Sequence, residues 1–408
     1  MQEQQGFFGS YRILDLTDEQ AQLGGKLLAD MGAEVIKVEP PKGDKTRFRG
    51  PFFHDEIGTE KSLYFIYFNT NKKSVTLNLE SEDGKSLFLE LAKRADAVME
   101  SLPVGYLKSL GLDYEELRKV NPKLVMASVS PFGRTGPYSS YQSCDLVNMA
   151  MSGYMQITGE PDGPPVRFGA EQSYVAASHC AAAATAIALF HCQTSGEGQY
   201  VDISVVEAVA TYTQEALQAE TWFCAKDNVL RSGMKSRRFF PFGCFQCKDG
   251  WGSIGAITAK EWDAFAEWVS EVSGEKEILD DMYKGGIYAR TPYVDFLDPY
   301  VTDVFTSRLT RGELFHQGQQ RGIVCLPVYD VGEVVEDPHF NARDFFQETG
   351  HPIVGKLRYH RGPYISHEVP WQFRRSAPLL GEHNEEIYCG ELGFSKEKLT
   401  MLRSAGVI

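Results

Sequence analysis

The stretch YRILDLTDEQAQLGGKLLADMGAEVIKVEP, residues 11–40, decides the fold. Its first seven residues, Tyr11–Thr17, are apolar enough for a buried strand. A helix is expected through Gly24–Gly32, and Ala33–Pro40 has the pattern of a second buried strand. A strand–helix–strand order of this kind is typical of a parallel sheet with helices packed over it.

The same alternation continues outward along the chain. Strands are expected at residues 74–80, 96–101 and 124–132, and helices at 83–95, 113–121, 172–194 and 395–406. Residues 199–209 are expected to return to a strand and then a helix. Residues 81–84 supply polar side chains suited to cap the helix that starts near Glu82. The sequence therefore predicts an α/β fold.

The composition changes between about Phe223 and Val324. Residues 239–256 read as a β-hairpin with its turn at Lys248–Gly250, and residues 260–272 as an amphipathic helix. We therefore predict a large domain of residues 1–222 plus 328–408 and a small α+β domain of residues 223–327. The small domain contains a basic loop, Arg231–Arg238, which either is solvated or holds a substrate carboxylate.

Composition excludes several classes of protein. The formal net charge of −14 over 408 residues argues against binding to nucleic acid or to an anionic membrane. No secretory signal is visible, and the longest apolar stretch, Cys180–Phe190, is too short to span a bilayer. Eight scattered cysteines fit reduced thiols, and the pair Cys244 and Cys247 lacks a second pair at zinc spacing. We expect a cytoplasmic protein without a metal.

Common catalytic and nucleotide-binding motifs are missing. The chain has no G-x-x-x-x-G-K-[ST], no G-x-G-x-x-G after the first strand, no G-x-S-x-G and no H-E-x-x-H. Function has to be inferred from a less common constellation of residues.

Several long segments, in collinear order, together provide that constellation. They include ADMGAEVIKVEPPKGDKTR (29–47), SLYFIYFNTNKKSVTLNL (62–79), LGLDYEELRKVNPKLVMASVSPFGRTGPY (110–138), GIVCLPVYDVGEVVEDPHFNARDFF (322–346) and APLLGEHNEEI (377–387). This ordered set resembles the family III CoA-transferases over nearly the whole chain. The resemblance implies a Rossmann-like large domain with a smaller inserted domain, an interlocked dimer, a CoA thioester as substrate and no tightly bound cofactor.

The resemblance also locates the catalytic nucleophile of the family, an aspartate that attacks a thioester to form a mixed anhydride. In a gapless register after the turn GEPDGPPVRFG, Tyr174 stands at that aspartate's position. With a pKa near 10, only about one free phenol in a thousand is ionised at pH 7, so Tyr174 is a poor substitute. Glu171, one helical turn earlier, is either a replacement nucleophile or a solvated or capping glutamate.

Other positions match residues of the family's active site. Gln20 matches a glutamine beside the reacting carbonyl, and Asp145 an acidic residue, although a helix cap and a backbone contact are equally reasonable roles for them. The positions matched to CoA contacts are Gln20, Ala21, Lys72, Lys73, Leu77, Leu79 and Lys108. However, ESLPVG (100–105) departs from the family's E-N-F-x-P-G, so it stays open whether CoA binds to this chain at all.

The departures resemble heteromeric members of the family that act on benzylsuccinate in anaerobic toluene degradation, in which one of two related subunits lacks the nucleophile. The resemblance implies a non-catalytic subunit and a paralogous catalytic partner, joined as an interlocked heterodimer or a larger assembly. One alternative is a self-sufficient CoA-transferase that uses Glu171. The other is an acyl-CoA racemase, but Ser143-Cys144-Asp145 lacks the histidine of that group's G-H-D motif.

Overall fold

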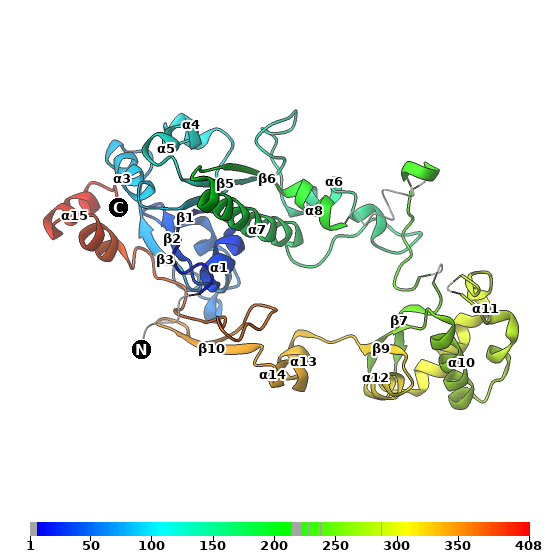
Figure 1. Cartoon of the computed structure of the whole chain (residues 1–408). Coiled ribbons are helices and arrows are strands. Elements are labelled where there is room, and N and C mark those ends of the chain that lie inside the picture. The colour runs from blue at the N-terminus through cyan, green and yellow to red at the C-terminus, as the bar shows by residue number, and fades with distance from the viewer. Residues whose placement is uncertain (1–5, 214–221, 227, 237–238, 287) are drawn as a thin grey trace. The chain divides into compact units, whose positions relative to one another are not determined.

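The computed structural model describes residues 6–408 apart from 214–221, 227, 237–238 and 287 (Figure 1). The chain folds into two compact units. The larger contains Met1–Tyr154, Phe168–Leu217 and His339–Ile408, and the smaller contains Met155–Arg167 and Gln218–Pro338.

A six-stranded sheet forms the centre of the larger unit. Its strands are β1 (Arg12–Leu16), β2 (Glu34–Glu39), β3 (Lys73–Thr76), β4 (Ala97–Glu100), β5 (Val125–Ser130) and β6 (Tyr200–Ser204). All neighbours pair in parallel, in the order β3-β2-β1-β4-β5-β6. This is the strand order of Rossmann folds, so the predicted Rossmann-like α/β architecture is confirmed.

Helices cover both faces of this sheet. Their bounds are α1 Gln22–Asp30, α2 Leu63–Phe68, α3 Glu82–Ala92, α4 Tyr106–Ser109, α5 Tyr114–Val120, α6 Asp145–Met151, α7 Gln172–Ser195, α8 Val205–Thr213 and α15 Lys396–Ser404. On β1, Ile13 packs with α1 and α7, whereas its neighbour Leu14 packs on the opposite face with α3, α5 and α15. A strand buried on both faces is mostly apolar, which explains the signal of residues 11–17, although the buried Asp15 interrupts the run.

The C-terminal segment covers the exposed edge of β3. The backbone N–H of His383 donates to the carbonyl of Ser74 at 2.9 Å, and the Ser74 N–H donates to His383 Nδ1 at 3.2 Å. Asn384 Oδ1 accepts from the Thr76 N–H at 2.9 Å, and the Tyr388 hydroxyl donates to the Thr76 carbonyl at 2.9 Å. These contacts satisfy backbone groups that an edge strand would otherwise expose. The segment also holds the hairpin β10 (Phe346–His351) and β11 (Gly355–His360), and a π-helical turn at Glu385–Glu391.

Helix α7 is 24 residues long, longer than the apolar stretch inside it, and by length and composition it is sufficient to cross a membrane. In the structure, Ala177, Ala181 and Leu189 are buried in the core against the sheet. Core helices of soluble proteins pass the same length and hydropathy criterion, and one side of α7 packs in the way such a helix does.

The smaller unit has its own core. Strands β7 (Phe242–Cys247), β8 (Gly250–Gly255) and β9 (Val324–Pro327) form an antiparallel sheet, which confirms the predicted hairpin. The accompanying helices are α10 Ala259–Ser273, α11 Val294–Pro299, α12 Arg311–Gln320 and α13 Val331–Glu336. Helix α14, Pro338–Ala342, begins at the last residue of this unit and otherwise belongs to the larger one. Aromatic side chains fill the core, and Trp268 and Phe305 meet edge to face with ring centroids 4.7 Å apart.

Arg231 joins residues 155–167 to this smaller unit. Its guanidinium donates to the carbonyls of Gln156, Glu160 and Gly163 at 3.1, 3.2 and 3.0 Å. The assignment of residues 155–167 to the smaller unit was not predicted, because a short loop has no hydrophobic periodicity. Within the basic loop, Arg231 therefore has a structural role, and Lys235 pairs with Asp298. The remaining two arginines, at positions 237 and 238, lie outside the described residues.

Candidate functional site

The first turn of α7 carries Tyr174, and three residues fix where that turn begins. Ala170 has a left-handed φ of 60°, and Glu171 is the N-cap residue but makes no capping bond with its side chain. Asp145, at the start of α6, accepts hydrogen bonds from the backbone N–H and the hydroxyl of Ser173, at 3.0 and 2.8 Å. Asp145 thus makes the backbone contact that was one of its two expected roles.

Tyr174 is 8% exposed and borders a cavity of about 310 Å³. The lining residues are Glu19, Gln22, Leu23, Arg49, Tyr64, Phe68, Ala170, Glu171, Tyr174, Val175 and Ser178. We call this cavity the Tyr174 pocket. All of its lining belongs to the larger unit, so α1, α2, α7 and the loops next to them build it.

The Tyr174 phenol stays neutral in this pocket. Burial raises its pKa above the usual value of 10, and the negative charges of Glu19 and Glu171 raise the pKa further. Each effect disfavours a phenolate. The structure thereby strengthens the argument from free tyrosine, because the pocket makes ionisation of Tyr174 harder still.

The Glu171 carboxylate is held by two donors. Arg49 Nη2 lies 2.5 Å from Oε1, and the Tyr64 hydroxyl donates to Oε2 at 3.1 Å. The Arg49 guanidinium also stacks over the Tyr64 ring, 4.2 Å from its centroid. Burial and then the charge of Glu171 raise the pKa of Tyr64, which keeps that hydroxyl a donor. A carboxylate whose negative charge is compensated by these two donors is a weaker nucleophile than a free carboxylate.

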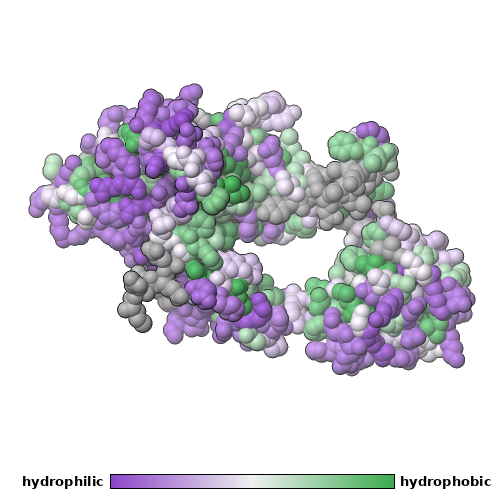
Figure 2. All heavy atoms as spheres, viewed as in Figure 1, coloured by the Kyte–Doolittle hydropathy of each residue, from purple (hydrophilic) through white to green (hydrophobic). Residues whose placement is uncertain are grey.

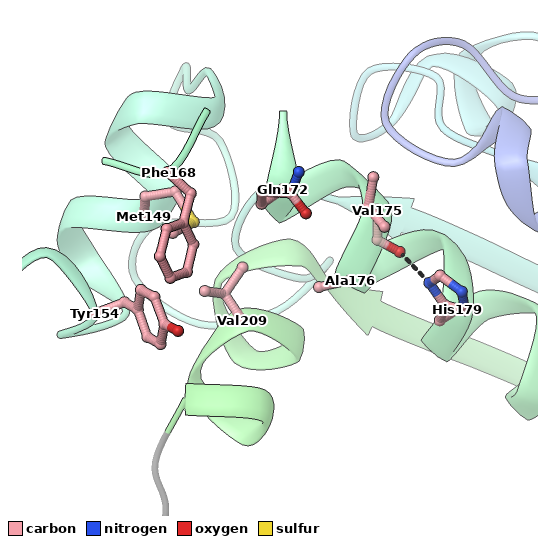
Figure 3. Close-up of a pocket in the computed structure, with 8 residues that line it drawn as sticks. All are labelled: Met149, Tyr154, Phe168, Gln172, Val175, Ala176, His179 and Val209. Carbon is pink, nitrogen blue, oxygen red and sulfur yellow. Dashed lines mark hydrogen bonds between the residues drawn. The ribbon is translucent and has the colours of Figure 1, made fainter. Parts of the chain in front are cut away.

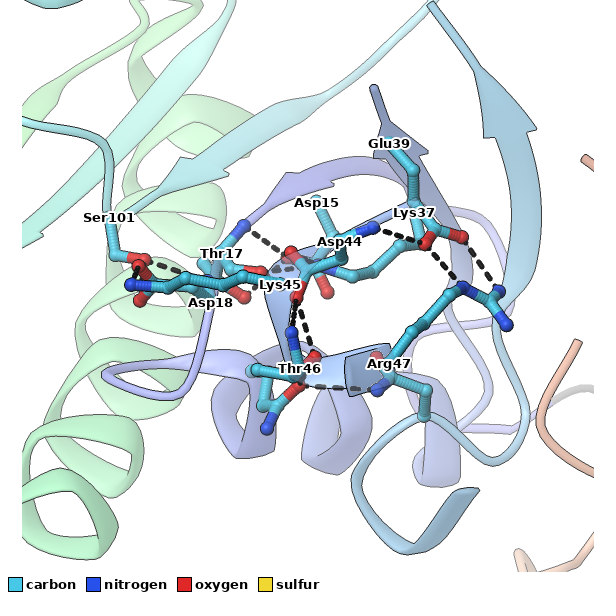
Figure 4. Close-up of polar contacts among 12 residues, drawn as sticks. Asp15, Thr17, Asp18, Lys37, Glu39, Asp44, Lys45, Thr46, Arg47 and Ser101 are labelled. Atoms are coloured by element: carbon cyan, nitrogen blue, oxygen red, sulfur yellow. Dashed lines mark hydrogen bonds and ion pairs between the residues drawn. The ribbon is translucent and has the colours of Figure 1, made fainter. Parts of the chain in front are cut away.

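Gln20 does not line this pocket. It lies beside Asp18 and Ser101, and its backbone N–H donates to Asp18 Oδ1 at 3.1 Å. Its side-chain nitrogen lies 3.5 Å from the Ser101 carbonyl. Gln20 Oε1 is buried and has no hydrogen-bond partner among the described residues. Figure 4 shows the Asp18–Ser101 contact at the edge of a polar network that continues to Lys45.

Lys72 is fully buried among internal acceptors. Its ammonium donates to Asp15 Oδ2 at 2.7 Å, to the Gln22 carbonyl at 2.8 Å and to Asn69 Oδ1 at 2.9 Å. Burial lowers the pKa of Lys72 to about 8 despite the opposing charge of Asp15. All three donors of the ammonium are used inside the protein, so this placement favours a structural role over contact with a CoA phosphate.

The other positions matched to CoA contacts have diverse surroundings. Ala21 and Leu77 are buried, Leu79 is half-buried against the core, and Lys73 pairs with Glu34 and Glu386. Lys108 is exposed and borders a second cavity of about 380 Å³. That cavity also contains an ion pair between Glu100 and Arg134, with the nitrogen and oxygen 2.5 Å apart. Glu100 begins the ESLPVG segment, so the sequence departure falls at a formed cavity.

A third cavity, of about 340 Å³, lies on another side of α7 (Figure 3). Its apolar lining includes Tyr154 and Phe168, whose rings meet with centroids 4.6 Å apart. Val175 borders both this cavity and the Tyr174 pocket. His179, one turn further along α7, also lines the third cavity, and its Nδ1 donates to the Val175 carbonyl at 2.8 Å.

Comparison with known proteins agrees with the Rossmann-like sheet order. The family model for CoA-transferase family III matches residues 10–384. The chain belongs to CoA-transferase family III. This confirms the family expected from the sequence and, with it, the assignment to the CoA-transferases.

Two curated relatives and one solved structure extend this family match over nearly the whole chain. The chain is 36% identical to succinyl-CoA:(R)-benzylsuccinate CoA-transferase subunit BbsE of Thauera aromatica over 402 residues, 96% of each chain. It is 31% identical to formyl-CoA:oxalate CoA-transferase of Streptomyces coelicolor, covering 97% of this chain and 98% of the relative. A CAIB/BAIF family protein from Brucella suis superimposes with a TM-score of 0.84 at 28% identity, over 95% of this chain and all of that one.

Proposed function

We propose that this chain is the subunit without a nucleophile in a heteromeric family III CoA-transferase. The complex would transfer CoA from succinyl-CoA to an aryl-substituted succinate, such as benzylsuccinate in anaerobic toluene degradation. The observation that carries the proposal is the burial of Tyr174, which keeps its phenol neutral, at the position that the family resemblance assigns to the nucleophile. The similarity to a succinyl-CoA:(R)-benzylsuccinate CoA-transferase subunit supports the substrate pair.

The chemistry of the step explains why Tyr174 cannot replace an aspartate. The nucleophile has to be ionised near neutral pH, and its acyl product has to remain reactive toward the returning CoA thiolate. A carboxylate meets both conditions. A phenol with a raised pKa is not ionised near neutral pH, and its acyl product would be an aryl ester, which is less reactive than an anhydride. The aspartate would come from a paralogous partner chain.

Exposed apolar side chains support such a partner. On α7, Ile187 and Phe190 are 69% and 67% exposed, although the opposite side of the same helix is buried in the core. Figure 2 shows hydrophobic atoms at the surface of the larger unit among mostly hydrophilic ones. Neighbouring apolar side chains left open to water are typical of a contact between chains. We propose an interlocked heterodimer, or a larger assembly of both chains, in the cytoplasm.

The test is to express this chain alone and together with its paralogue, and to assay CoA transfer from succinyl-CoA to benzylsuccinate. Hydroxylamine trapping followed by mass spectrometry then identifies which chain carries the acyl group. We expect activity only from the pair and the hydroxamate only on the partner's aspartate. Activity of this chain alone, or a hydroxamate on it, would overturn the proposal.

The main alternative makes Glu171 the nucleophile. In that case Glu171→Gln would abolish acyl trapping altogether, since loss of a nucleophile costs orders of magnitude in rate. Under our proposal, Glu171→Gln leaves acylation of the partner chain detectable.

A further inference from the structure

We propose that Arg49 and Tyr64 form a carboxylate-binding site in the Tyr174 pocket. Glu171 occupies this site in the free chain, and a carboxylic acid with an aryl or alkyl body displaces it. The inference rests on the proposed function in one respect: a pocket that no longer acylates can retain an unactivated acid.

The donors have the arrangement that a carboxylate requires. Arg49 Nη2 and the Tyr64 hydroxyl bind different oxygens of the same Glu171 carboxylate, at 2.5 and 3.1 Å. The guanidinium is oriented by stacking on the Tyr64 ring, and the Arg49 carbonyl accepts a hydrogen bond from the Ser62 hydroxyl at 2.5 Å. One guanidinium nitrogen and one phenol hydroxyl thus each bind one carboxylate oxygen, and the bond from the guanidinium is charge-assisted. A ligand carboxylate would find both donors already in place.

The Glu171 side chain can leave the site formed by Arg49 and Tyr64. Its side chain makes no capping bond to α7, and it is 27% exposed although Arg49 and Tyr64 hold it. It stands at the junction between the loop and the helix, where rotation of its side chain disturbs no helical hydrogen bond. The exchange replaces one carboxylate by another, so the charge of Arg49 stays compensated throughout.

The other residues that line the pocket indicate the size and polarity of the ligand's body. Leu23, Phe68, Tyr174 and Val175 provide apolar or aromatic wall, and Arg49 is the one basic residue in the described lining. Glu19 also borders the cavity and would repel a second carboxylate there. The volume of about 310 Å³ is near the lower limit of roughly 300 Å³ for small-molecule pockets. These features select a compact acid with one carboxylate at Arg49 and an apolar body.

The experiment is isothermal titration of the full-length chain with 3-phenylpropanoate, in the absence of any CoA compound. Its neutral isostere, 3-phenylpropanamide, is titrated in parallel. We expect the acid to bind and the amide to bind at least about tenfold more weakly, because a charge-assisted bond is lost. If the chain is soluble only with its partner, the same titrations on the complex report the number of sites.

Three variants and one control test the site. Arg49→Gln should weaken binding of the acid about tenfold or more, and Arg49→Lys should weaken it less, since the charge is kept but the planar guanidinium that stacks on Tyr64 is lost. Glu171→Gln should tighten binding about two- to fivefold, because the competing internal carboxylate is gone. Arg403→Gln, an exposed change of equal charge on α15, should leave the affinity unchanged.

Equal affinity of Arg49→Gln and the unaltered chain would overturn the inference. So would equal binding of acid and amide, or no binding of the acid to either the unaltered chain or Glu171→Gln. These titrations involve no turnover, so they are independent of the acyl-trapping result. A hydroxamate on this chain would reject the proposed function and leave the binding result standing.

Discussion

At the scale of single residues, buried charges of the larger unit form ion pairs with buried side chains of opposite charge. Lys72 is bound by Asp15, and Arg47 donates to both oxygens of Glu39, at 2.6 and 2.9 Å. All four of these side chains are fully buried. A buried charge is tolerated when its partner is present, and removing one partner leaves the other uncompensated.

Replacing Lys72 by methionine should therefore lower the free energy of unfolding by about 3 to 5 kcal/mol, because Asp15 would remain buried and charged. Urea denaturation followed by circular dichroism measures this change. Lys93→Met is the matched control, since Lys93 is 45% exposed and pairs with Glu90 at the surface. Its effect should stay within about 0.5 kcal/mol. Equal stability of the two variants would contradict the structural role of Lys72.

Replacing Tyr174 by aspartate should destabilise the chain by about 2 to 4 kcal/mol. The substitution removes a buried ring and places a third carboxylate near Glu19 and Glu171. Thermal unfolding measures the loss, and Tyr174→Phe, which keeps the ring, should change stability by less than about 1.5 kcal/mol. A Tyr174→Asp variant as stable as the original would show that the pocket tolerates the family's nucleophile without further change.

Part of the site could be predicted from the sequence, and part could not. Tyr174 and Glu171 were located by counting residues from the turn at 159–169, because the register there is local and free of gaps. Arg49 and Tyr64 were missed, since they lie 122 and 107 residues from Glu171 along the chain. Which distant residues meet is decided by how the strands and helices pack together, and local sequence patterns do not reveal that packing.

At the scale of elements, the core strands were the predictable part. Runs such as Tyr11–Thr17 and Ala33–Pro40 predict β1 and β2, because a strand buried on both faces is mostly apolar. The buried charges on these two strands, Asp15, Lys37 and Glu39, are the exceptions. The π-helical turn Glu385–Glu391 and its attachment to β3 gave no such signal. Its partners on β3 are over 300 residues away, and polar side chains make the contact.

His383 should make this attachment sensitive to pH. Burial lowers the pKa of His383 below its usual 6.5; Glu382 opposes this shift and Arg375 adds to it. The folded state therefore binds this proton less readily than the unfolded state. The stabilising contribution is present above about pH 6.5 and is lost as pH falls through the folded pKa, by up to about 1.4 kcal/mol per pH unit.

Urea denaturation at pH 7.5, 6.5 and 5.5 tests this prediction. His383→Gln retains a polar side chain but cannot titrate, so its stability should depend less steeply on pH than that of the original chain. A variant with an unchanged slope would assign the pH dependence to other groups, such as His351, whose pKa is also lowered by burial.

At the scale of the whole molecule, the proposed interlocked heterodimer makes a kinetic prediction. Threaded chains separate only if one of them unfolds, so subunits of two differently tagged complexes should not exchange over days at 25 °C. Native mass spectrometry after mixing measures the exchange. Brief exposure to urea followed by refolding should produce the mixed species. Free exchange within an hour would exclude interlocking.

The contacts of Arg231 with residues 155–167 have a consequence for dissecting this protein. Because the smaller unit is built from two separate stretches of chain, two cuts cannot release it intact. A recombinant fragment of residues 218–338 would lack the carbonyls of Gln156, Glu160 and Gly163, and its Arg231 guanidinium would lose three acceptors. Gene fusions and shuffled chimaeras that exchange this unit between relatives should therefore carry both stretches together.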